Sequence, residues 1–450
     1  MLPALQAQTK NGHHPPPAPV PDAVMAQESV SAAHYRDALD DFIRSQSINT
    51  RRGAAALRPF RTDEFGKQPA SPSKAHIESA NELIVMLRRQ LLAWANTVHQ
   101  TAEKSQHYPD PRLLQQLLQR KERTESWIKM IEKVWDFYFE MFSQRQTRYG
   151  EWLLAADRIA QDCYQSVYTN LGEPRSIPTP GPFTYMDTGF GPATFRRGVK
   201  LTRLGKNANK FPVVQLPYHR LVNPWTLGAI HHEVSHNLQS DLGMWRTVPM
   251  HIGMRLRRAG VPRGATAVWM RWHKEIWADL GGLLLGGPAI VTSLMDVLSR
   301  VPKVVYRFNP NGVHPTPYLR AMINFELLRR MGFVEEAAVS QRLWMQLYPQ
   351  PRGIPAQIMR TFPQAHRLVV DTICFQPYRE LGGKRLVDVV AFRPEHQAMV
   401  QEAAARLAAG TDPGIIPPRF LIGAGREALS RDLARPGQIT SNFYQALVRR

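Results

Sequence analysis

Two histidines and a glutamate stand close together in the segment 227–243, LGAIHHEVSHNLQSDLG. His232, Glu233 and His236 fit the pattern H-E-x-x-H, which is typical of a metal-binding helix. On a helix, side chains four residues apart project about 40° from each other, one turn apart, so both imidazoles can reach one ion. Imidazole nitrogens suit Zn²⁺, and Glu233, on the adjacent flank, can touch a water on the metal without binding the metal itself. The segment therefore predicts two zinc ligands, His232 and His236, and a catalytic base, Glu233.

An acidic pair farther along the chain supplies further site residues. The segment 273–287, HKEIWADLGGLLLGG, places Glu275 and Asp279 four residues apart on one helix face. A catalytic zinc takes three protein ligands and keeps one position open, and two histidines with one glutamate are a standard set. Glu275 is therefore the predicted third ligand. Asp279 is predicted to assist cofactor binding by holding the second ring nitrogen of a ligating histidine.

The two helices that would carry these residues each have a face suited to packing. Four apolar residues recur at helical spacing on the side opposite the histidines: Leu227, Ile230, Val234 and Leu238. This spacing predicts that one side of the first helix lies in the core and the other faces a cleft. Asn223-Pro224 is typical of a helix start. On the second helix, Gly282 and Gly286 share the face of the acidic pair, so the two helices are expected to approach each other closely.

These motifs together resemble a known group of enzymes. H-E-x-x-H followed by Glu275-Ile-Trp-Ala278-Asp279 is similar to the pattern of the gluzincin metallopeptidases. A third element, His314-Pro315-Thr-Pro-Tyr-Leu-Arg320, resembles the H-P loop and downstream arginine of the family of the CaaX prenyl protease and the heat-shock membrane protease. The resemblance covers about residues 195–335. It departs from the family in two respects: no flanking membrane helices are evident, and Val313 stands where Thr or Ser usually precedes the H-P loop.

The resemblance implies a zincin-like catalytic domain. Such a domain has a small mixed sheet, an active-site helix, and an edge strand that pairs with an extended peptide substrate. We place that edge strand at 211–216. The resemblance also implies that His314 and Arg320 stabilise the oxyanion of the reaction, with Tyr318 and Tyr306 as further candidates. For His314, capping of a turn in its loop is the alternative.

The function expected from these residues is zinc-dependent hydrolysis of a peptide bond, as in a metalloendopeptidase. Metal-activated water would attack, and Glu233 would act as general base. The expected substrate is a peptide or protein. Two alternatives stay open. One is a catalytically silent zinc-binding structural or interaction module, and the other is a basic protein associated with nucleic acid.

The predicted fold class is α+β and mainly helical. Residues 1–74 read as a mostly disordered Pro-rich tail with one short helix around 34–45, and 75–171 read as a helical domain. The zincin-like domain is expected at 172–345, with strands at 194–202 and 211–216, and a C-terminal mixed or helical region at 346–450.

The chain as a whole has a formal net charge of +20. This charge indicates an acidic partner or a polyanion, although the basic residues are scattered and no nucleic-acid motif accompanies them. Two cysteines, Cys163 and Cys374, make no disulfide framework. The longest uncharged apolar stretch, 280–295, is shorter than the ~20 residues of a membrane-spanning helix. A soluble, cytoplasmic protein without a membrane span is therefore expected; the sequence does not indicate its oligomeric state.

Overall fold

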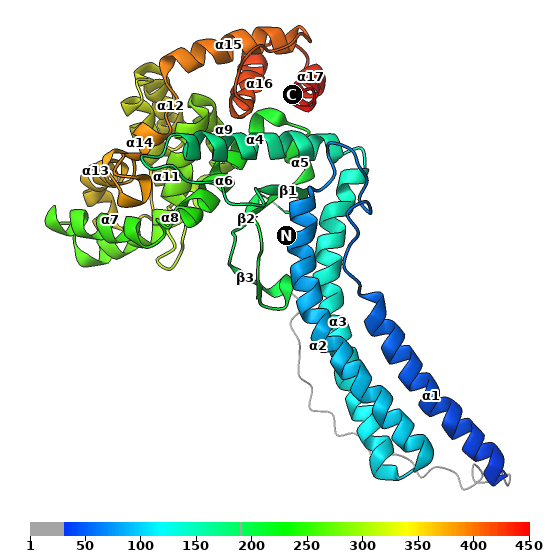
Figure 1. Ribbon diagram of the computed structural model, residues 1–450. Coiled ribbons are helices and arrows are strands. Elements are labelled where there is room, and N and C mark those ends of the chain that lie inside the picture. The colour runs from blue at the N-terminus through cyan, green and yellow to red at the C-terminus, as the bar shows by residue number, and fades with distance from the viewer. Residues whose placement is uncertain (1–30, 190) are drawn as a thin grey trace. The chain divides into compact units, whose positions relative to one another are not determined.

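The computed structural model describes residues 31–189 and 191–450. As predicted, the chain is mainly helical with a small mixed sheet (Figure 1). It divides into two compact units: one joins the described residues up to Ala56 with Leu91–Ser126, and the other joins Leu57–Gln90 with Trp127–Arg450. Across the described ranges, no helix combines the length and apolar character needed to cross a bilayer.

Parts of three long helices build the first unit. They are α1 (Ala32–Ala56), α2 (Lys74–His107) and α3 (Pro111–Ser143). Their small core contains four residues: Ile43, Val98, Ala102 and Leu117. α1 is longer than the short helix expected around 34–45. The part of the predicted tail at 1–30 lies outside the described residues.

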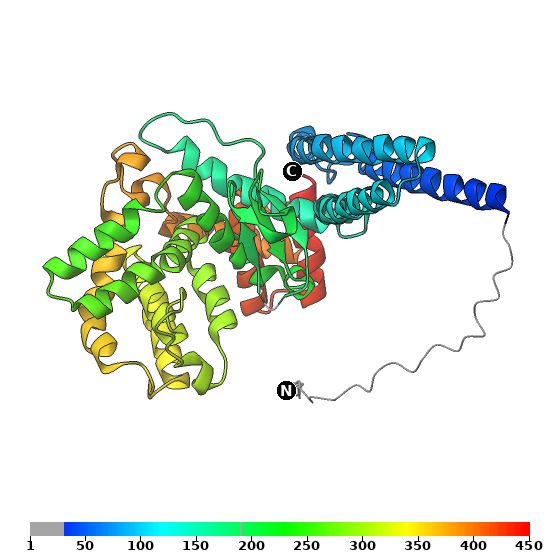
Figure 2. The same ribbon diagram turned by 90° about the horizontal axis from the view of Figure 1, so that it is seen from below.

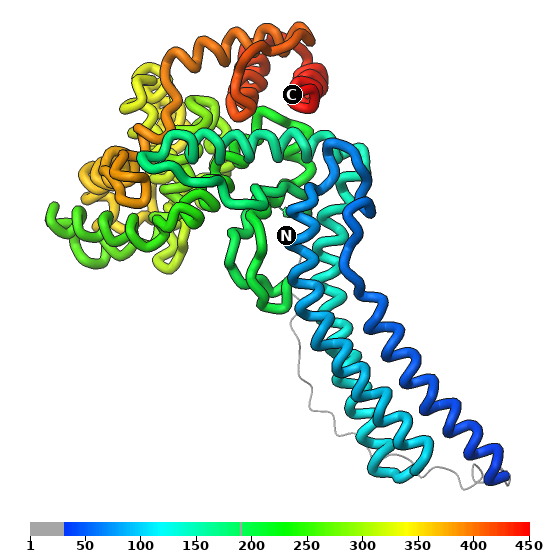
Figure 3. The backbone as a smooth tube through the Cα atoms, viewed as in Figure 1, coloured from blue at the N-terminus to red at the C-terminus, as the bar shows by residue number. Residues whose placement is uncertain are grey.

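The second unit contains the shorter helices and all the strands, which Figure 2 shows from below and Figure 3 as a continuous backbone trace. Its helices are α4 (Gly150–Thr169), α5 (Tyr218–Leu221), α6 (Gly228–Asp241), α7 (Thr247–Arg258), α8 (Arg263–Gly286), α9 (Pro288–Leu298), α10 (Pro302–Val305), α11 (Pro317–Arg330), α12 (Val334–Leu347), α13 (Ala356–Val370), α14 (Leu386–Val389), α15 (Pro394–Ala408), α16 (Leu421–Ser430) and α17 (Pro436–Val448). Its strands are β1 (Phe183–Met186), β2 (Ala193–Phe195), β3 (Lys200–Leu201), β4 (Asn207–Ala208) and β5 (Val213–Leu216).

The order of the main sheet, β1-β5-β2, corrects one prediction. β5 runs parallel to β1 and antiparallel to β2, so the strand placed at 211–216 is central and not an edge. The physical reason is its apolar run: Val213, Val214 and Leu216 are all fully buried, as in a strand covered on both faces. The strand expected at 194–202 is divided into β2 and β3, which pairs only with β4.

α6 and α8 form the centre of the second unit. The predicted apolar stripe of α6 is buried, from Leu227 to Leu238. α8 is buried along most of its length, and the Trp277 indole N–H donates a hydrogen bond to the carbonyl oxygen of Ser235 on α6 (3.1 Å). At Asn223-Pro224 the chain makes a short 3₁₀ turn, and α6 itself begins at Gly228.

The contact between α6 and α8 gives a first prediction. A Cβ added to Gly281 on α8 would lie 2.8 Å from the Ser235 Oγ and 3.1 Å from its Cβ. We expect Gly281→Ala to lower the free energy of unfolding by about 1–3 kcal/mol, because the helices would have to move apart. Gly264 is on the same helix, and a Cβ added there would make only an ordinary contact, 3.6 Å from the Gln357 Oε1, so Gly264→Ala should leave that free energy unchanged or raise it by up to ~1 kcal/mol. Urea unfolding of both variants measures the difference, and equal midpoints would contradict this account of the packing.

Candidate metal centre

Two packed helices bring the candidate ligands together. His232 and His236 lie on α6, and Glu275 lies on α8. The predicted glycine face makes this approach close. A Cβ on Gly282 would lie 3.3 Å from the backbone nitrogen of His232, and one on Gly286 would lie 3.0 Å from the neighbouring His231 ring. Larger residues at these positions would therefore push Glu275 away from the histidines.

The spacing of the three ligand atoms fits a single metal ion. The Nε2 atoms of His232 and His236 are 3.1 Å apart. The Glu275 Oε2 lies 3.5 Å from the first nitrogen and 3.7 Å from the second. Tetrahedral metal–nitrogen bonds of about 2.0–2.1 Å place two ligand atoms roughly 3.3 Å apart. Within the described residues, these three side chains form a group that could hold a metal ion.

Behind the ligands, Asp279 holds His232 in place. Its Oδ1 lies 2.8 Å from the His232 Nδ1, which leaves the Nε2 directed toward His236 and Glu275. Arg320 then binds Asp279 with two parallel hydrogen bonds, from Nε to Oδ2 (2.6 Å) and from Nη2 to Oδ1 (2.8 Å). The pair fixes both the position and the charge of Asp279. The structure thus brings Asp279 against His232 and Arg320 against Asp279.

The buried charges of the site favour a cation. Burial alone would raise the pKa of Asp279, but Arg320 and His232 lower it to about 2. Burial likewise opposes ionisation of Glu275, yet hydrogen bonds with His232, His236 and His314 hold its pKa well below the usual range. For His232, burial lowers the pKa, whereas hydrogen bonds with Asp279 and Glu275 outweigh it and raise the pKa to about 10. The same carboxylates that hold a proton on His232 would hold a metal cation in its place.

Glu233 faces the same site from α6. It lines a cavity of about 150 Å³ together with His232, Glu275 and Asp279, and is 7 % exposed. Among residues 31–189 and 191–450, no hydrogen bond or ion pair reaches its carboxylate. Among the described residues, neither Glu233 oxygen is one of the fully buried side-chain atoms that lack a partner, so the carboxylate is open to the cavity and can meet a polar group there. This position is the one that a base acting on a water needs.

His314 reaches the cluster from the loop before α11. Its Nε2 lies 3.2 Å from the Glu275 Oε2, and its side chain is 61 % exposed. The turn in this loop is capped instead by Asn309, whose Oδ1 accepts a hydrogen bond from the Asn311 N–H. The geometry therefore favours a role at the site over turn capping for His314.

The two further candidates for stabilising the oxyanion lie away from the cavity. Tyr306 and Tyr318 are buried and pack edge to face, with ring centroids 5.7 Å apart. Neither lines the cavity that contains Glu233. The apolar wall of that cavity, which α9 supplies through Ile290, Leu294 and Val297, was not predicted from the sequence. Their spacing of three and four residues was the available signal.

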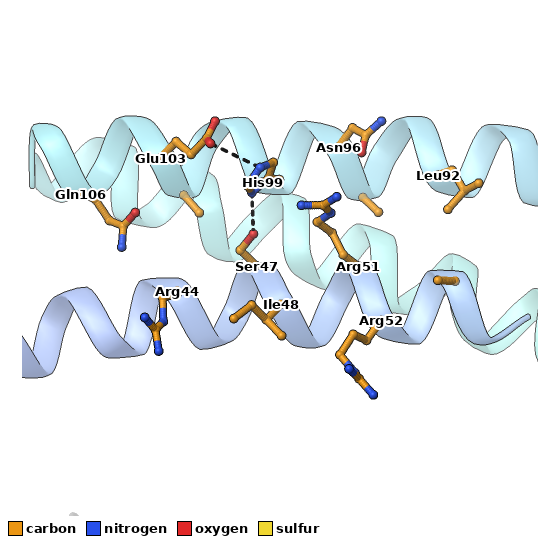
Figure 4. A pocket seen from close by; sticks show the side chains of 13 residues that line it. Arg44, Ser47, Ile48, Arg51, Arg52, Leu92, Asn96, His99, Glu103 and Gln106 are labelled. Atoms are coloured by element: carbon orange, nitrogen blue, oxygen red, sulfur yellow. Dashed lines mark hydrogen bonds and ion pairs between the residues drawn. The ribbon is translucent and has the colours of Figure 1, made fainter.

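A larger hollow, of about 580 Å³, lies within the first unit between α1 and α2 (Figure 4). In it the Ser47 Oγ lies 2.9 Å from the His99 Nδ1, and the His99 Nε2 lies 3.3 Å from the Glu103 Oε1. This order of side chains is that of a nucleophilic triad. However, Ser47 is buried, and all three residues lie inside helices whose backbone N–H groups are already hydrogen-bonded, so none is left to hold an oxyanion. We interpret these contacts as hydrogen bonds that hold α1 to α2.

Asp279 gives a second prediction. Loss of a residue that orients a ligand typically costs about 10–100-fold in metal affinity. We therefore expect Asp279→Ala to weaken the metal site by that factor without emptying it, whereas Glu275→Ala, which removes a ligand atom, should weaken it more. Competition with a metal chelator measures both affinities. An Asp279→Ala affinity equal to wild type would show that the contact with His232 is dispensable.

Comparisons of the chain with protein-family models, with curated proteins and with solved structures find no match. The geometry of the site is therefore the ground for assigning a function.

Proposed function

We propose that this protein is a zinc-dependent peptidase. The observation that supports the proposal most is the convergence of His232, His236 and Glu275 beside the unpaired carboxylate of Glu233 in one cavity. Two imidazole nitrogens and one carboxylate oxygen are a donor set typical of catalytic zinc. Counted formally, the carboxylates of Glu233, Glu275 and Asp279 exceed the one guanidinium of Arg320 by two charges, which Zn²⁺ would balance.

Each side chain of the site has a task in this reaction. Bound zinc supplies Lewis acidity, which polarises a carbonyl and acidifies water. Glu233 accepts a proton from the attacking water and delivers it to the leaving amine. His314, which stands at the open side of Glu275, is the candidate donor to the oxyanion. Arg320 acts through Asp279 as a positioning residue, because its two hydrogen bonds to that carboxylate keep His232 oriented.

We further propose that the catalytic region is a distant relative of the gluzincins. Support comes from the way its motif residues meet: Glu275 faces the two histidines, Asp279 contacts His232, and the Arg320 that follows the His314 loop closes on Asp279. The sequence supplies the residue types, whereas the fold gathers them into one cluster that extends from His232 to Arg320, 88 residues apart.

The strand that would receive a peptide substrate is β2, since β5 is occupied on both sides. β2 is an edge of the sheet, and Gly191 and Pro192, directly before it, line the cavity with Glu233. Thr194 on β2 accepts a hydrogen bond from Asn237 on α6 (2.8 Å), which ties the strand to the helix of the histidines. A peptide paired with β2 would be held by its backbone and pass the cavity.

The test is metal analysis combined with cleavage of a mixed peptide library by the full-length chain. A peptidase shows about one zinc per chain and new peptide termini that disappear on chelation and return with added zinc. Zinc retained with no cleavage of any library member would favour a structural zinc module instead. Nucleic-acid binding that survives competition by random polyanions, with no cleavage of peptides, would favour a basic protein associated with nucleic acid.

A further inference from the structure

α12 exposes an unusual amount of apolar surface for one short helix. It contributes five of the 20 large apolar side chains that the described residues expose: Val334, Val339, Leu343, Met345 and Leu347. Contiguous exposed apolar surface marks interaction sites, whereas apolar side chains exposed singly are normal, so only those that share one side of the helix point to such a site. The helix is yellow in Figure 1 and belongs to the second unit.

Three of these side chains form one stripe. Val339, Leu343 and Leu347 follow at intervals of four residues and are 62 %, 47 % and 51 % exposed. The packed face lies roughly 100–120° around the helix from this stripe: Ala337 and Trp344 are fully buried, and the Trp344 indole N–H donates to the carbonyl oxygen of Tyr318 on α11 (3.3 Å). The stripe therefore occupies one exposed flank of α12, where another helix can lie along it.

The surface around the two ends of α12 carries opposite charge, although the last turn of the helix itself has no basic residue. Glu335 and Glu336 are exposed in its first turn. At the other end, Lys303, Arg307 and Arg352 are exposed and line one open hollow of the surface. That hollow is fixed to the end of α12 because the Tyr348 hydroxyl donates to the Arg300 carbonyl oxygen (2.8 Å) and the Gln350 N–H to the Tyr306 hydroxyl (3.3 Å).

We propose that this surface binds a second copy of the chain, with the two α12 helices antiparallel. A two-fold axis near Leu343 would place the two Leu343 side chains against each other and Val339 of one copy against Leu347 of the other. The acidic end of each helix would then face the basic end of its partner, whereas parallel pairing would oppose like charges. A membrane surface fits less well, since an interfacial helix is rich in Lys and Arg on its polar face and α12 itself carries two acids and one arginine.

The experiment is sedimentation equilibrium of the full chain over a wide concentration range. We expect the mass to rise from 51.2 kDa toward twice that value in wild type. Leu343→Glu should weaken the dimer by at least about 100-fold, because two carboxylates would meet at the axis. Met345→Glu is the matched control. Met345 is 46 % exposed, close to the value for Leu343, but points to the other side of the helix. The dimer of Met345→Glu should therefore be as stable as that of wild type.

A charge exchange tests the orientation and does not depend on the leucine variant. Replacing both Glu335 and Glu336 by Lys should weaken the dimer, and adding Lys303→Glu, Arg307→Glu and Arg352→Glu to that variant should restore it. Circular dichroism of every variant checks the fold. A monomeric wild type, a dimer that Leu343→Glu does not weaken, or no recovery in the exchanged variant would overturn the proposal. If the wild type is monomeric and binds anionic vesicles, and Leu343→Glu abolishes that binding, the surface would be assigned to a membrane instead.

Discussion

Glu233→Gln is expected to reduce peptide cleavage by about 10²–10⁴-fold while zinc stays bound, because the amide cannot accept the proton of the attacking water. The fold should survive, since the amide is nearly the same size and no hydrogen bond or ion pair in the described chain depends on that carboxylate. The measurements are the rate of peptide cleavage, the zinc content and the unfolding midpoint of the same preparation. The prediction rests on the proposed peptidase activity.

Glu233→Asp is the control for this change. It keeps a carboxylate but withdraws it by one methylene group, so we expect a rate between those of wild type and Glu233→Gln. Cleavage by Glu233→Gln at the wild-type rate would refute the role of this residue as base, because no other unpaired carboxylate was found in the cavity among the described residues. A fall in zinc content instead of rate would make Glu233 a ligand.

The contact between α6 and α8 could be predicted from sequence because it depends on local periodicity. Ligands four residues apart, an apolar stripe opposite them and two glycines on the facing helix are all patterns within one turn or two. Each pattern limits how its helix can be oriented, so the sequence predicts that His232, His236 and Glu275 lie close together. The identity of the metal and the reaction cannot be predicted from the spacing of residues, because they depend on the chemistry of the bound groups.

The sheet shows where such reasoning stops. The apolar run of β5 indicates a strand, but its neighbours are set by pairing with β1 and β2, which lie about 20–30 residues earlier in the chain. β1 lies in the Pro- and Gly-rich segment 172–192, for which no strand was predicted, and without β1 the strand at 211–216 was expected at the edge of the sheet. The bidentate contact of Arg320 with Asp279 spans 41 residues and has no local signal either. Pairings of this kind are decided by the tertiary fold.

His232→Ala or His236→Ala is expected to abolish stoichiometric metal binding, from about one zinc per chain to none, since each removes one of the three proposed ligands. The loss has a second consequence that needs no activity. An ion that binds only the folded state stabilises it by about 2.7 kcal/mol at 100 times its Kd, so the unfolding temperature of wild type should rise with added zinc and that of either variant should not.

His219→Ala serves as the control, because His219 is exposed at α5, before α6. It should bind zinc and respond to it as wild type does. His232→Ala has a further effect on the group behind it: Asp279 loses its contact with the imidazole but keeps both hydrogen bonds from Arg320, so the apo-protein should remain folded. Full zinc occupancy in both histidine variants would place the metal, and with it the proposed reaction, somewhere other than between α6 and α8.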